Sequence, residues 1–228
     1  MKAMILAAGR GERMRPLTDH TPKPLLQVSG QALIEHTINQ LVSAGFTDIV
    51  INHAHLGQQI VDYLGDGQRY GANIHYSAEG ELGLETAGGI INALPLLGEG
   101  VFLVVNADIA TDFSYAQLKE QAIDLAHLVL IDNPDHHPQG DFGLDELGQV
   151  CELSSKQLTF SGIGLYHTDL FKDLSAGSRK LGLLLRTAIR SGQVTGQYYS
   201  GFWMDIGTPE RLQALEALNW PRNKFGSM

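Results

Sequence analysis

The chain has 228 residues, of which 43% are hydrophobic and 18% charged. These are globular values, so they exclude a generally disordered protein. No apolar run approaches the roughly 18 residues of a membrane span, and the apolar run at 3–8 is too short for a signal peptide. The net charge of -9 argues against non-specific binding to nucleic acid, and the single cysteine, Cys151, cannot form an intrachain disulfide. We therefore expect a cytoplasmic protein with neither nucleic-acid nor membrane partners.

Positive charge is concentrated at the N-terminus of this acidic chain. Residues 1–30 hold five Lys and Arg against two Asp and Glu, whereas the remaining residues hold 11 against 23. No Lys or Arg occurs between Lys23 and Arg69. This distribution indicates a local anion-binding site rather than a long basic groove.

The first half alternates strand patterns with helix patterns. Apolar β-type runs predict strands over 2–7, 48–53, 73–76, 101–105 and 128–132. Apolar residues at helical spacing predict helices over 33–42, around 60–64, over 86–94 and over 115–125. The order predicts an α/β fold with a doubly wound, mostly parallel sheet, which binds ligands beyond the carboxyl ends of its strands.

The second half is less regular and predicts a small mixed β/α portion. We expect strands over 158–167, 194–199 and 202–206, and a helix over 181–189. A last helix begins with Thr208 as N-cap and Pro209 at its first position. The sequence shows no linker, so we predict a single domain over 1–220, with a first part at about 1–125, a second part at about 126–220 and a tail at 221–228.

A glycine-rich loop with arginines follows the first predicted strand. Gly9 and Gly11 allow backbone N–H groups to turn toward an anion, and the arginines add positive charge. The loop lacks the third glycine of the dinucleotide-binding fingerprint and the Gly-Lys-Ser/Thr of a P-loop. Further on, two prolines flank Lys23 and stiffen its backbone. We interpret the two segments as a phosphate-binding site, although Lys23 taken alone could be an ordinary solvated lysine.

Two aspartates stand where metal ligands are expected. Asp108 follows the apolar strand at 101–105, and Asp205 lies within the apolar stretch at 202–208. Mg²⁺ prefers oxygen ligands and commonly takes one or two protein carboxylates, so these residues predict a Mg²⁺ site that Mn²⁺ could also occupy. The alternatives are a strand-end cap for Asp108 and a helix-end partner for Asp205. The adjacent His136 and His137 lack zinc-ligand spacing, and we interpret them as part of a loop.

Taken together, the motifs resemble the signature of the sugar 1-phosphate nucleotidyltransferase family. The matching stretches are 6–18 (LAAGRGERMRPLT), 22–25 (PKPL), Asp108 after its strand, and 203–208 (WMDIGT). The sequence departs from the family at Ala107, where glycine is usual. The resemblance implies a Rossmann-like nucleotidyltransferase fold that moves a nucleotidyl group from an NTP to a sugar 1-phosphate, with a sugar-binding second part.

The resemblance also implies roles for individual residues. Catalytic residues would be Arg13 and Lys23. The nucleotide would contact Ala8, Gly9, Gly11, Glu12, Arg13, Lys23, Thr86 and Asn106. The sugar would contact Asp141, Glu152, Ser161 and Gly162, and the metal Asp108 and Asp205. Thr86 could equally be a plain helix cap.

Within the family, segments such as 132–137 and 140–142 are most similar to a short branch. Its members are uridylyltransferases that act on N-acetylmuramic acid 1-phosphate in bacterial cell-wall recycling, so UTP is the expected nucleotide. The alternatives are a short enzyme that forms GDP-mannose or dTDP-glucose, and a non-catalytic relative that senses nucleotide-sugars. A dehydrogenase is disfavoured by the missing fingerprint. We expect a monomer or a weak homodimer.

Overall fold

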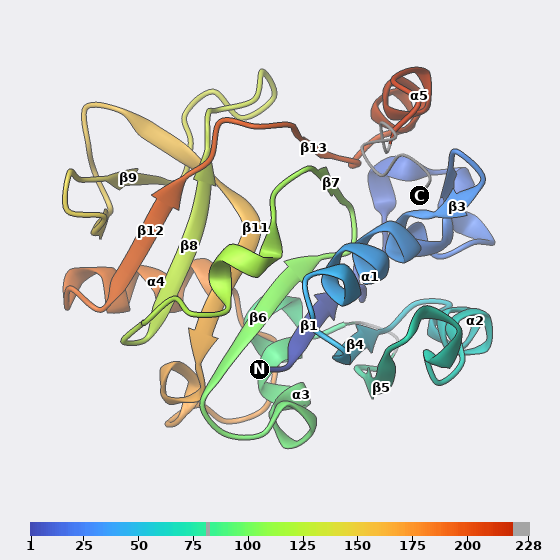
Figure 1. The fold of residues 1–228 in the computed structure, drawn as a ribbon, viewed down its shortest axis with the longest axis horizontal. Coiled ribbons are helices and arrows are strands. Elements are labelled where there is room, and N and C mark those ends of the chain that lie inside the picture. The colour runs from blue at the N-terminus through green and yellow to red at the C-terminus, as the bar shows by residue number, and fades with distance from the viewer. Residues whose placement is uncertain (81–82, 221–228) are drawn as a thin grey trace.

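A mixed β-sheet runs through the molecule and carries helices on both faces (Figure 1). The structure is a computed structural model that describes residues 1–80 and 83–220. Within these residues, nine strands form the sheet in the order β10-β9-β11-β6-β1-β4-β5, with β8 and then β12 attached through β11. The strands are β1 (Ala3–Leu6), β4 (Asp48–His53), β5 (Asn73–Ala78), β6 (Val101–Asn106), β8 (Ala126–Ile131), β9 (Phe142–Leu144), β10 (Val150–Cys151), β11 (Gln157–His167) and β12 (Val194–Tyr198).

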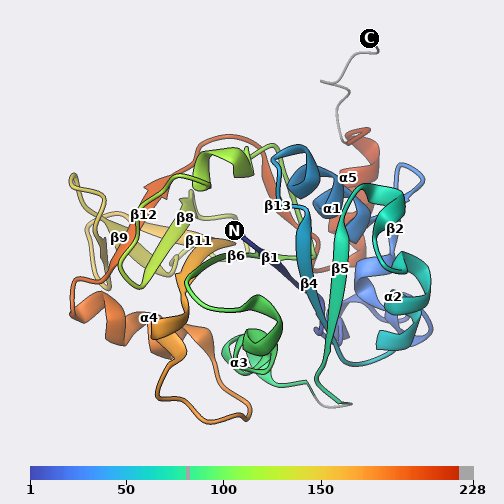
Figure 2. The same cartoon turned by 60° about the horizontal axis from the view of Figure 1, so that its bottom comes forward.

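The N-terminal part of the sheet is wholly parallel. β1 lies between β4 and β6, with Ile5 opposite both Ile51 and Val105, and β5 extends the sheet beyond β4. The predicted doubly wound arrangement is confirmed, because helices pack on both faces (Figure 2). One face carries α1 (Leu33–Ser43) and α2 (Gly57–Leu64), and the other carries α3 (Glu85–Leu97) and α4 (Leu181–Arg190).

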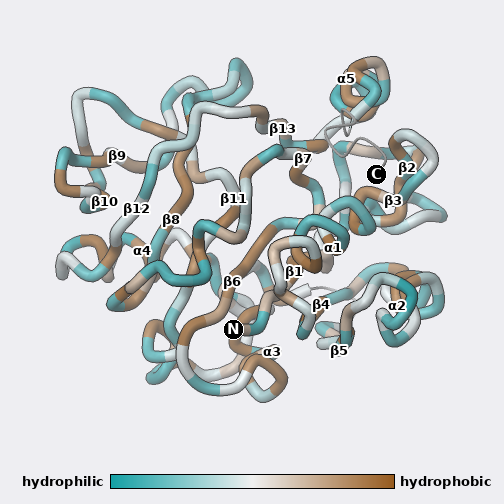
Figure 3. Tube along the Cα trace, viewed as in Figure 1, coloured by the Kyte–Doolittle hydropathy of each residue, from teal (hydrophilic) through white to brown (hydrophobic). Residues whose placement is uncertain are grey.

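Alternation along the central strands divides the core into two clusters. Ile5 of β1 packs toward α1, whereas its neighbour Met4 packs toward α3. Side chains of β6 alternate in the same way, which explains why its sequence is apolar almost throughout. Figure 3 shows this as hydrophobic colour along the central strands. Fully burying one such side chain stabilises the fold by roughly 1.5–3 kcal/mol, so these strands are a rigid base for the loops at their ends.

The C-terminal part returns to the sheet in the opposite direction. β11 is antiparallel to both β6 and β8, and its register shifts between Phe160 and Gly164. Outside the large sheet, β13 (Trp203–Asp205) pairs with β7 (Ile109–Thr111), and β2 (Gln27–Val28) pairs with β3 (Gln31–Ala32). The antiparallel ladder between β7 and β13 carries the chain back over the carboxyl end of β6.

The ends of two helices follow their sequence signals. α5 (Pro209–Ala217) begins at the predicted N-cap, where the Thr208 hydroxyl accepts a hydrogen bond from the Arg211 amide. α1 is followed by Gly45 with φ of +80°, a left-handed conformation in which its N–H reaches the Val42 carbonyl.

The helix predicted over 115–125 is wrong. The chain forms one short 3₁₀ turn, η5 (Tyr115–Leu118), and then continues without regular structure to β8. Tyr115 and Leu118, three residues apart, are both buried, so a single turn satisfies the apolar pattern. No helix in residues 1–80 and 83–220 is both long and apolar enough to cross a membrane. The predicted tail at 221–228 lies outside the described residues, and the single-domain assignment remains a prediction.

Candidate nucleotide and metal site

A cavity of about 420 Å³ opens at the carboxyl ends of β1, β4 and β6. This is the edge at which a doubly wound sheet is expected to bind ligands. It is lined by Leu6, Ala7, Ala8, Gly9, Arg10, Lys23, Pro24, Asn52, Glu79, Gly83, Leu84, Glu85, Thr86, Asn106, Ala107, Asp108 and Ser178.

The glycine-rich loop folds tightly against the segment that carries Lys23. Gly11 has φ of +70°, and a Cβ there would lie 3.0 Å from the Thr18 methyl and 3.3 Å from the Lys23 Cβ. The Thr18 hydroxyl donates to the Gly11 carbonyl at 2.9 Å. A Cβ on Gly9, by contrast, would meet no protein atom within 4 Å, so the space above this residue is free for a ligand.

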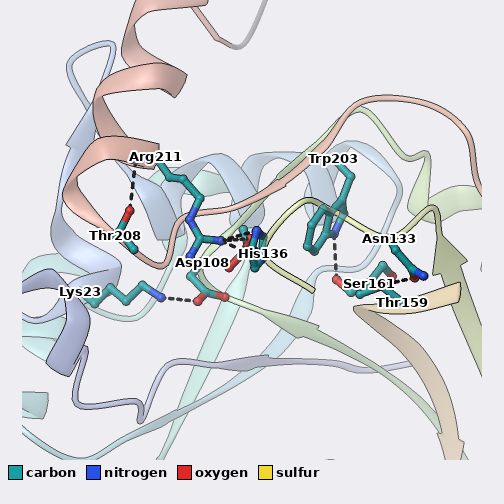
Figure 4. A network of polar contacts seen from close by, with 10 residues as sticks. Lys23, Asp108, Asn133, His136, Thr159, Ser161, Trp203, Thr208 and Arg211 are labelled. Carbon is teal, nitrogen blue, oxygen red and sulfur yellow. Dashed lines mark hydrogen bonds and ion pairs between the residues drawn. The ribbon is translucent and has the colours of Figure 1, made fainter. Parts of the chain in front are cut away.

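Lys23 is held close to Asp108. It begins the short helix η3 (Lys23–Leu25), with Pro22 before it and the buried Pro24 after it. Its ammonium forms an ion pair and hydrogen bond with the Asp108 carboxylate, as Figure 4 shows. The Lys23 side chain is only 13% exposed and that of Asp108 is 30% exposed. The pair therefore lies in the cavity wall rather than on an open surface.

Asp108 and Asp205 are brought together by the ladder between β7 and β13. Asp205 pairs with Ile109, and the Ile206 amide donates to the Asp108 carbonyl at 2.7 Å. Asp205 forms an ion pair with Arg211, and its Oδ1 lies 3.1 Å from the His136 Nε2. Two carboxylates, each facing a cationic partner, thus lie at neighbouring backbone positions.

This donor set fits a hard divalent cation. No group of three or more His, Cys, Asp or Glu that could hold a metal occurs in the described part of the chain. Mg²⁺ does not require such a group, because it keeps several water and phosphate ligands and takes only one or two protein carboxylates. Asp108 and Asp205 can supply those two oxygens, whereas a zinc site would demand more protein ligands.

The bulge in β11 packs against Asn106 at the end of β6, and its residues do not line the cavity. Gly162 has φ of +77°, and a Cβ there would lie 2.6 Å from the Asn106 amide nitrogen. The Trp203 indole N–H donates to the Ser161 carbonyl at 2.9 Å, which joins β13 to this bulge (Figure 4). Ser161 and Gly162 therefore lie beside the end of β6, and their contact with a sugar stays a prediction.

The segment 132–141 is ordered by polar side chains. Asn133 accepts from the Thr159 hydroxyl at 2.9 Å and donates to the Gln157 carbonyl. Asp141 accepts from the Phe160 amide at 2.8 Å and lies 3.1 Å from the His137 Nε2. His136 extends from the same loop to Asp205 and Arg211, a contact between distant segments that the loop sequence does not indicate.

The structure places the expected nucleotide residues unequally. Those that line the cavity are Ala8, Gly9, Lys23, Thr86 and Asn106. Gly11 and Arg13 do not line it, and Glu12 forms long, exposed ion pairs with Arg10 and Arg15. Arg13 lies instead on the side of Asp205. A Cβ on Gly207 would lie 2.9 Å from the Arg13 Nη2 and 3.1 Å from the Asp205 Oδ2.

Glu152 contacts basic residues of α4, and its predicted sugar contact stays a prediction. Its carboxylate pairs with Arg190 at 2.6 Å and lies 3.8 Å from Arg186, both on α4. Like the other predicted sugar residues, Asp141, Ser161 and Gly162, it does not line the cavity. The short sequence match that suggested a sugar contact did not account for these basic residues, which lie more than thirty positions later in the chain.

Asn52 and Glu79 line the cavity but were missed. Asn52 is the last residue but one of β4, and Glu79 directly follows β5. Polar residues at the carboxyl ends of parallel strands are a usable signal for a binding site, which would have identified both.

Comparisons with known proteins agree with this geometry. The model of the family described as "Nucleotidyl transferase" matches residues 2–218. The chain is 54% identical to N-acetylmuramate alpha-1-phosphate uridylyltransferase from Neisseria meningitidis serogroup B, covering 96% of this chain and 98% of that protein. It is 33% identical to the protein of the same name from Caulobacter vibrioides, over 94% of this chain and 95% of the other.

A solved structure shares the whole fold. It is described as a putative glucose-1-phosphate thymidylyltransferase from Bacillus anthracis in complex with a sucrose. The TM-score is 0.85 at 26% identity, with 100% of this chain and 98% of that chain covered.

Proposed function

The chain belongs to the nucleotidyl transferase family, and we propose that it transfers a uridylyl group from UTP to N-acetylmuramic acid 1-phosphate. The relative that is 54% identical carries this activity in its name, and the similarity extends over nearly the full length of both proteins. The products are a UDP-sugar and pyrophosphate. The second relative, from Caulobacter vibrioides, carries the same name over a similar span.

The observation that carries the proposal is the position of Lys23 and Asp108 in one wall of the cavity, beside the glycine-rich loop. A phosphate oxygen of the sugar 1-phosphate attacks the α-phosphorus of UTP, a new P–O bond forms, and the bond to the β-phosphate breaks. Pyrophosphate leaves with the electron pair. No side chain needs to become covalently modified, because both reactants bring phosphate groups and positioning supplies most of the rate.

The phosphate loop and Lys23 act on the charge of the triphosphate. Backbone N–H groups near Ala8 and Gly9 bind phosphate oxygens in the open space above Gly9. The Lys23 ammonium stabilises the charge that builds up on the reacting phosphates. Arg13 adds positive charge from the side of Asp205, while Thr86 and Asn106 contact the nucleoside.

Asp108 and Asp205 would hold Mg²⁺, and Mn²⁺ could replace it since it accepts the same oxygen ligands. When bound, the ion offsets the negative charge of the phosphates and orients them. Lys23 and Arg211 neutralise the two carboxylates in the described structure. If Mg²⁺ takes their place at the carboxylates, the Lys23 ammonium and the Arg211 guanidinium would lie next to the phosphates.

The sugar lies on the side formed by β11 and the segment 132–141. Ser161 and Gly162 present backbone groups beside Asn106, and Asp141 is held by the Phe160 amide. Asp141 accepts hydrogen bonds from sugar hydroxyls through its remaining lone pairs. Glu152 is not included because α4 already binds its carboxylate.

We also propose that the reaction takes place in the cytoplasm, where UTP is available, and that the enzyme acts as a monomer or weak homodimer. Leu212, Leu215 and Leu218 form an apolar stripe along the last helix, and Leu215 is fully buried against Met14 and Val28 of the same chain. That stripe is therefore used internally and offers little surface to a second subunit. Sedimentation at several protein concentrations measures the oligomeric state directly.

The function is tested by measuring pyrophosphate release from a panel of nucleotides and sugar phosphates. UTP, CTP, GTP and dTTP are each combined with the 1-phosphates of N-acetylmuramic acid, N-acetylglucosamine, glucose and mannose. We expect UTP with N-acetylmuramic acid 1-phosphate to give the highest kcat/KM, by at least about tenfold, which corresponds to about 1.4 kcal/mol. A faster reaction with mannose or glucose 1-phosphate would instead identify an enzyme that forms GDP-mannose or dTDP-glucose. Binding without turnover for every pair would indicate a sensor.

A further inference from the structure

Glu85, at the start of α3, lines the cavity with a backbone conformation that glutamate disfavours. Its φ is +59°, in the left-handed region that glycine enters freely and other L-residues enter only with strain. Four non-glycine residues have positive φ within 1–80 and 83–220, and of these Glu85 is the one that lines this cavity. Strained residues persist where the surrounding structure fixes them, and they gather at functional sites. The surroundings of Glu85 therefore indicate what its side chain does.

Hydrogen bonds on both sides of residue 85 impose this conformation. The Leu84 amide donates to the Glu79 carboxylate at 2.7 Å, and the Leu84 carbonyl accepts from the Arg179 amide at 3.0 Å. On the other side, the Ala87 amide donates to the Arg179 carbonyl at 3.0 Å. The chain before and after residue 85 is thus held by fixed partners. Glycine would satisfy the same backbone without strain, so the fold alone does not require glutamate here.

The Glu85 carboxylate has no hydrogen bond or ion pair with the part of the chain that the structure describes. Glu79 in the same cavity differs, because the Asn52 side chain and the Leu84 amide each donate to one of its oxygens. A carboxylate in the first turn of a helix gains a small stabilisation from the helix dipole, which is weaker than the strain of a left-handed glutamate. A ligand that donates hydrogen bonds to the Glu85 carboxylate would account for the difference.

A free carboxylate in this cavity must face an uncharged part of the ligand that carries hydrogen-bond donors. Carboxylate oxygens only accept hydrogen bonds, and their charge repels phosphate groups. In the proposed function the phosphates lie against Gly9 and Lys23, whereas Glu85 is adjacent to Thr86 at the nucleoside. The ribose of an NTP carries hydroxyls on two adjacent carbons, and the two carboxylate oxygens can accept one hydrogen bond from each. Such bonds to a charged acceptor are stronger than those between neutral groups.

We propose that Glu85 is a specificity-determining residue that accepts hydrogen bonds from the ribose hydroxyls of the nucleotide. The site then prefers ribonucleotides to deoxyribonucleotides, and the strain at residue 85 is the cost of aiming the carboxylate at the ribose. The proposal rests on the proposed function, because it assumes that an NTP occupies the cavity. It deepens that function by naming the pentose that the site accepts.

The first test compares UTP with its 2′-deoxy and 3′-deoxy analogues, each of which lacks one of the two hydroxyls. Dissociation constants are measured by calorimetry without sugar phosphate, and kcat/KM is measured with it. We expect wild type to prefer UTP over each analogue by at least about tenfold, which is about 1.4 kcal/mol. Glu85→Gln replaces one acceptor oxygen by a donor, so the preference over at least one analogue should fall at least about fivefold through weaker UTP binding. No preference in the wild type, or unchanged preferences in a folded, active Glu85→Gln variant, would overturn the proposal.

The second test separates the carboxylate from the backbone strain. Glu85→Gly removes both, so we expect the preference for UTP to fall as in Glu85→Gln while Tm rises by about 2 °C or more. Ser29→Gly is the matched control, because Ser29 has φ of +52° outside the cavity, and glycine keeps its amide, which donates to Glu216. This control should also raise Tm and leave both preferences within about twofold of wild type. A lower Tm with unchanged preferences in Glu85→Gly would assign Glu85 to the fold and refute the proposal.

The sugar 1-phosphate also carries hydroxyls, and the kinetics distinguish it from the ribose. If the two Glu85 variants raise KM for the sugar 1-phosphate and keep the wild-type preference for UTP, the carboxylate faces that sugar and the proposal fails.

The outcomes also distinguish this proposal from the proposed function. If the wild-type protein binds UTP more tightly than both analogues, and Glu85→Gln loses this preference, but no UDP-sugar is formed, the function fails and the ribose contact stands. If UDP-sugar is formed and both Glu85 variants keep the wild-type preferences, the function stands and the ribose contact fails. Circular dichroism of each variant shows that it is folded.

Discussion

The two halves of the molecule build their parts of the cleft in different ways. In the first half, parallel strands β1, β4, β5 and β6 end at one edge, and the cavity-lining residues lie at or just beyond these ends. In the second half, the site residues come from the bulge in β11, the segment 132–141 and the returning strand β13. Parallel strand ends thus make a site from local motifs, whereas the second half depends on contacts between distant segments.

The largest expected effect tests the first half at Lys23. We predict that Lys23→Ala lowers kcat by about 10²–10³, the usual effect of losing a group that stabilises transition-state charge, while UTP binding weakens much less. Lys23→Arg should restore only part of the rate, because a planar guanidinium cannot replace a compact ammonium. Steady-state kinetics and calorimetry measure the two quantities. A wild-type kcat in Lys23→Ala would mean that Lys23 only neutralises Asp108.

The second prediction concerns the ladder that joins the halves. Asp108→Asn and Asp205→Asn each remove one carboxylate from the proposed metal site, so we expect the Mg²⁺ concentration for half-maximal activity to rise about tenfold or more. Titrations of activity with Mg²⁺ and with Mn²⁺ measure this shift. Unchanged metal dependence in Asp205→Asn would assign that aspartate to Arg211 alone and leave Asp108 as the single protein ligand.

The third prediction tests the second half by comparing two of its acidic residues. Asp141→Asn should raise KM for the sugar 1-phosphate several-fold, since hydrogen bonds to a charged group contribute roughly 1.5–3 kcal/mol. Glu152→Gln should leave kcat/KM within about twofold and lower stability by at most about 1 kcal/mol, because its partners on α4 are largely exposed. A large loss of activity in Glu152→Gln would mean that Glu152 does contact the sugar.

The smallest expected effect concerns the stability of the first half away from the cleft. Burial alone would raise the pKa of Glu35, but hydrogen bonds from Tyr70, the Ala32 amide and Tyr63 outweigh it and hold the pKa below its ordinary value. A lowered carboxyl pKa stabilises the folded state above the unfolded pKa, and this contribution is lost as pH falls through the folded value.

Glu35→Gln should therefore lower the free energy of unfolding by about 1 kcal/mol at neutral pH, with no effect on kcat. The difference from wild type should shrink below about pH 4, where the unfolded carboxyl is protonated. Urea denaturation at several pH values measures it. A difference that does not vary with pH would mean that packing, rather than charge, accounts for the loss.

The sequence by itself determined the class of fold and predicted the phosphate side of the site. Apolar strand runs and helical spacing are local properties of the chain, and so are the glycines of the loop and the prolines around Lys23. Each can be interpreted without knowing what lies opposite. The helix expected over 115–125 failed because its two buried residues, Tyr115 and Leu118, needed only one turn.

The tertiary structure alone decided which charged side chains meet. Asp108 pairs with Lys23, 85 positions away, and Glu152 pairs with Arg190, 38 positions later. The sequence offered both as site residues, and only the tertiary structure shows that Glu152 lies against basic side chains of α4. Asn52 and Glu79 likewise meet beside Gly89, where α3 packs closely against both side chains. Ion pairs and hydrogen bonds act over a few ångströms, so sequence distance carries almost no information about them.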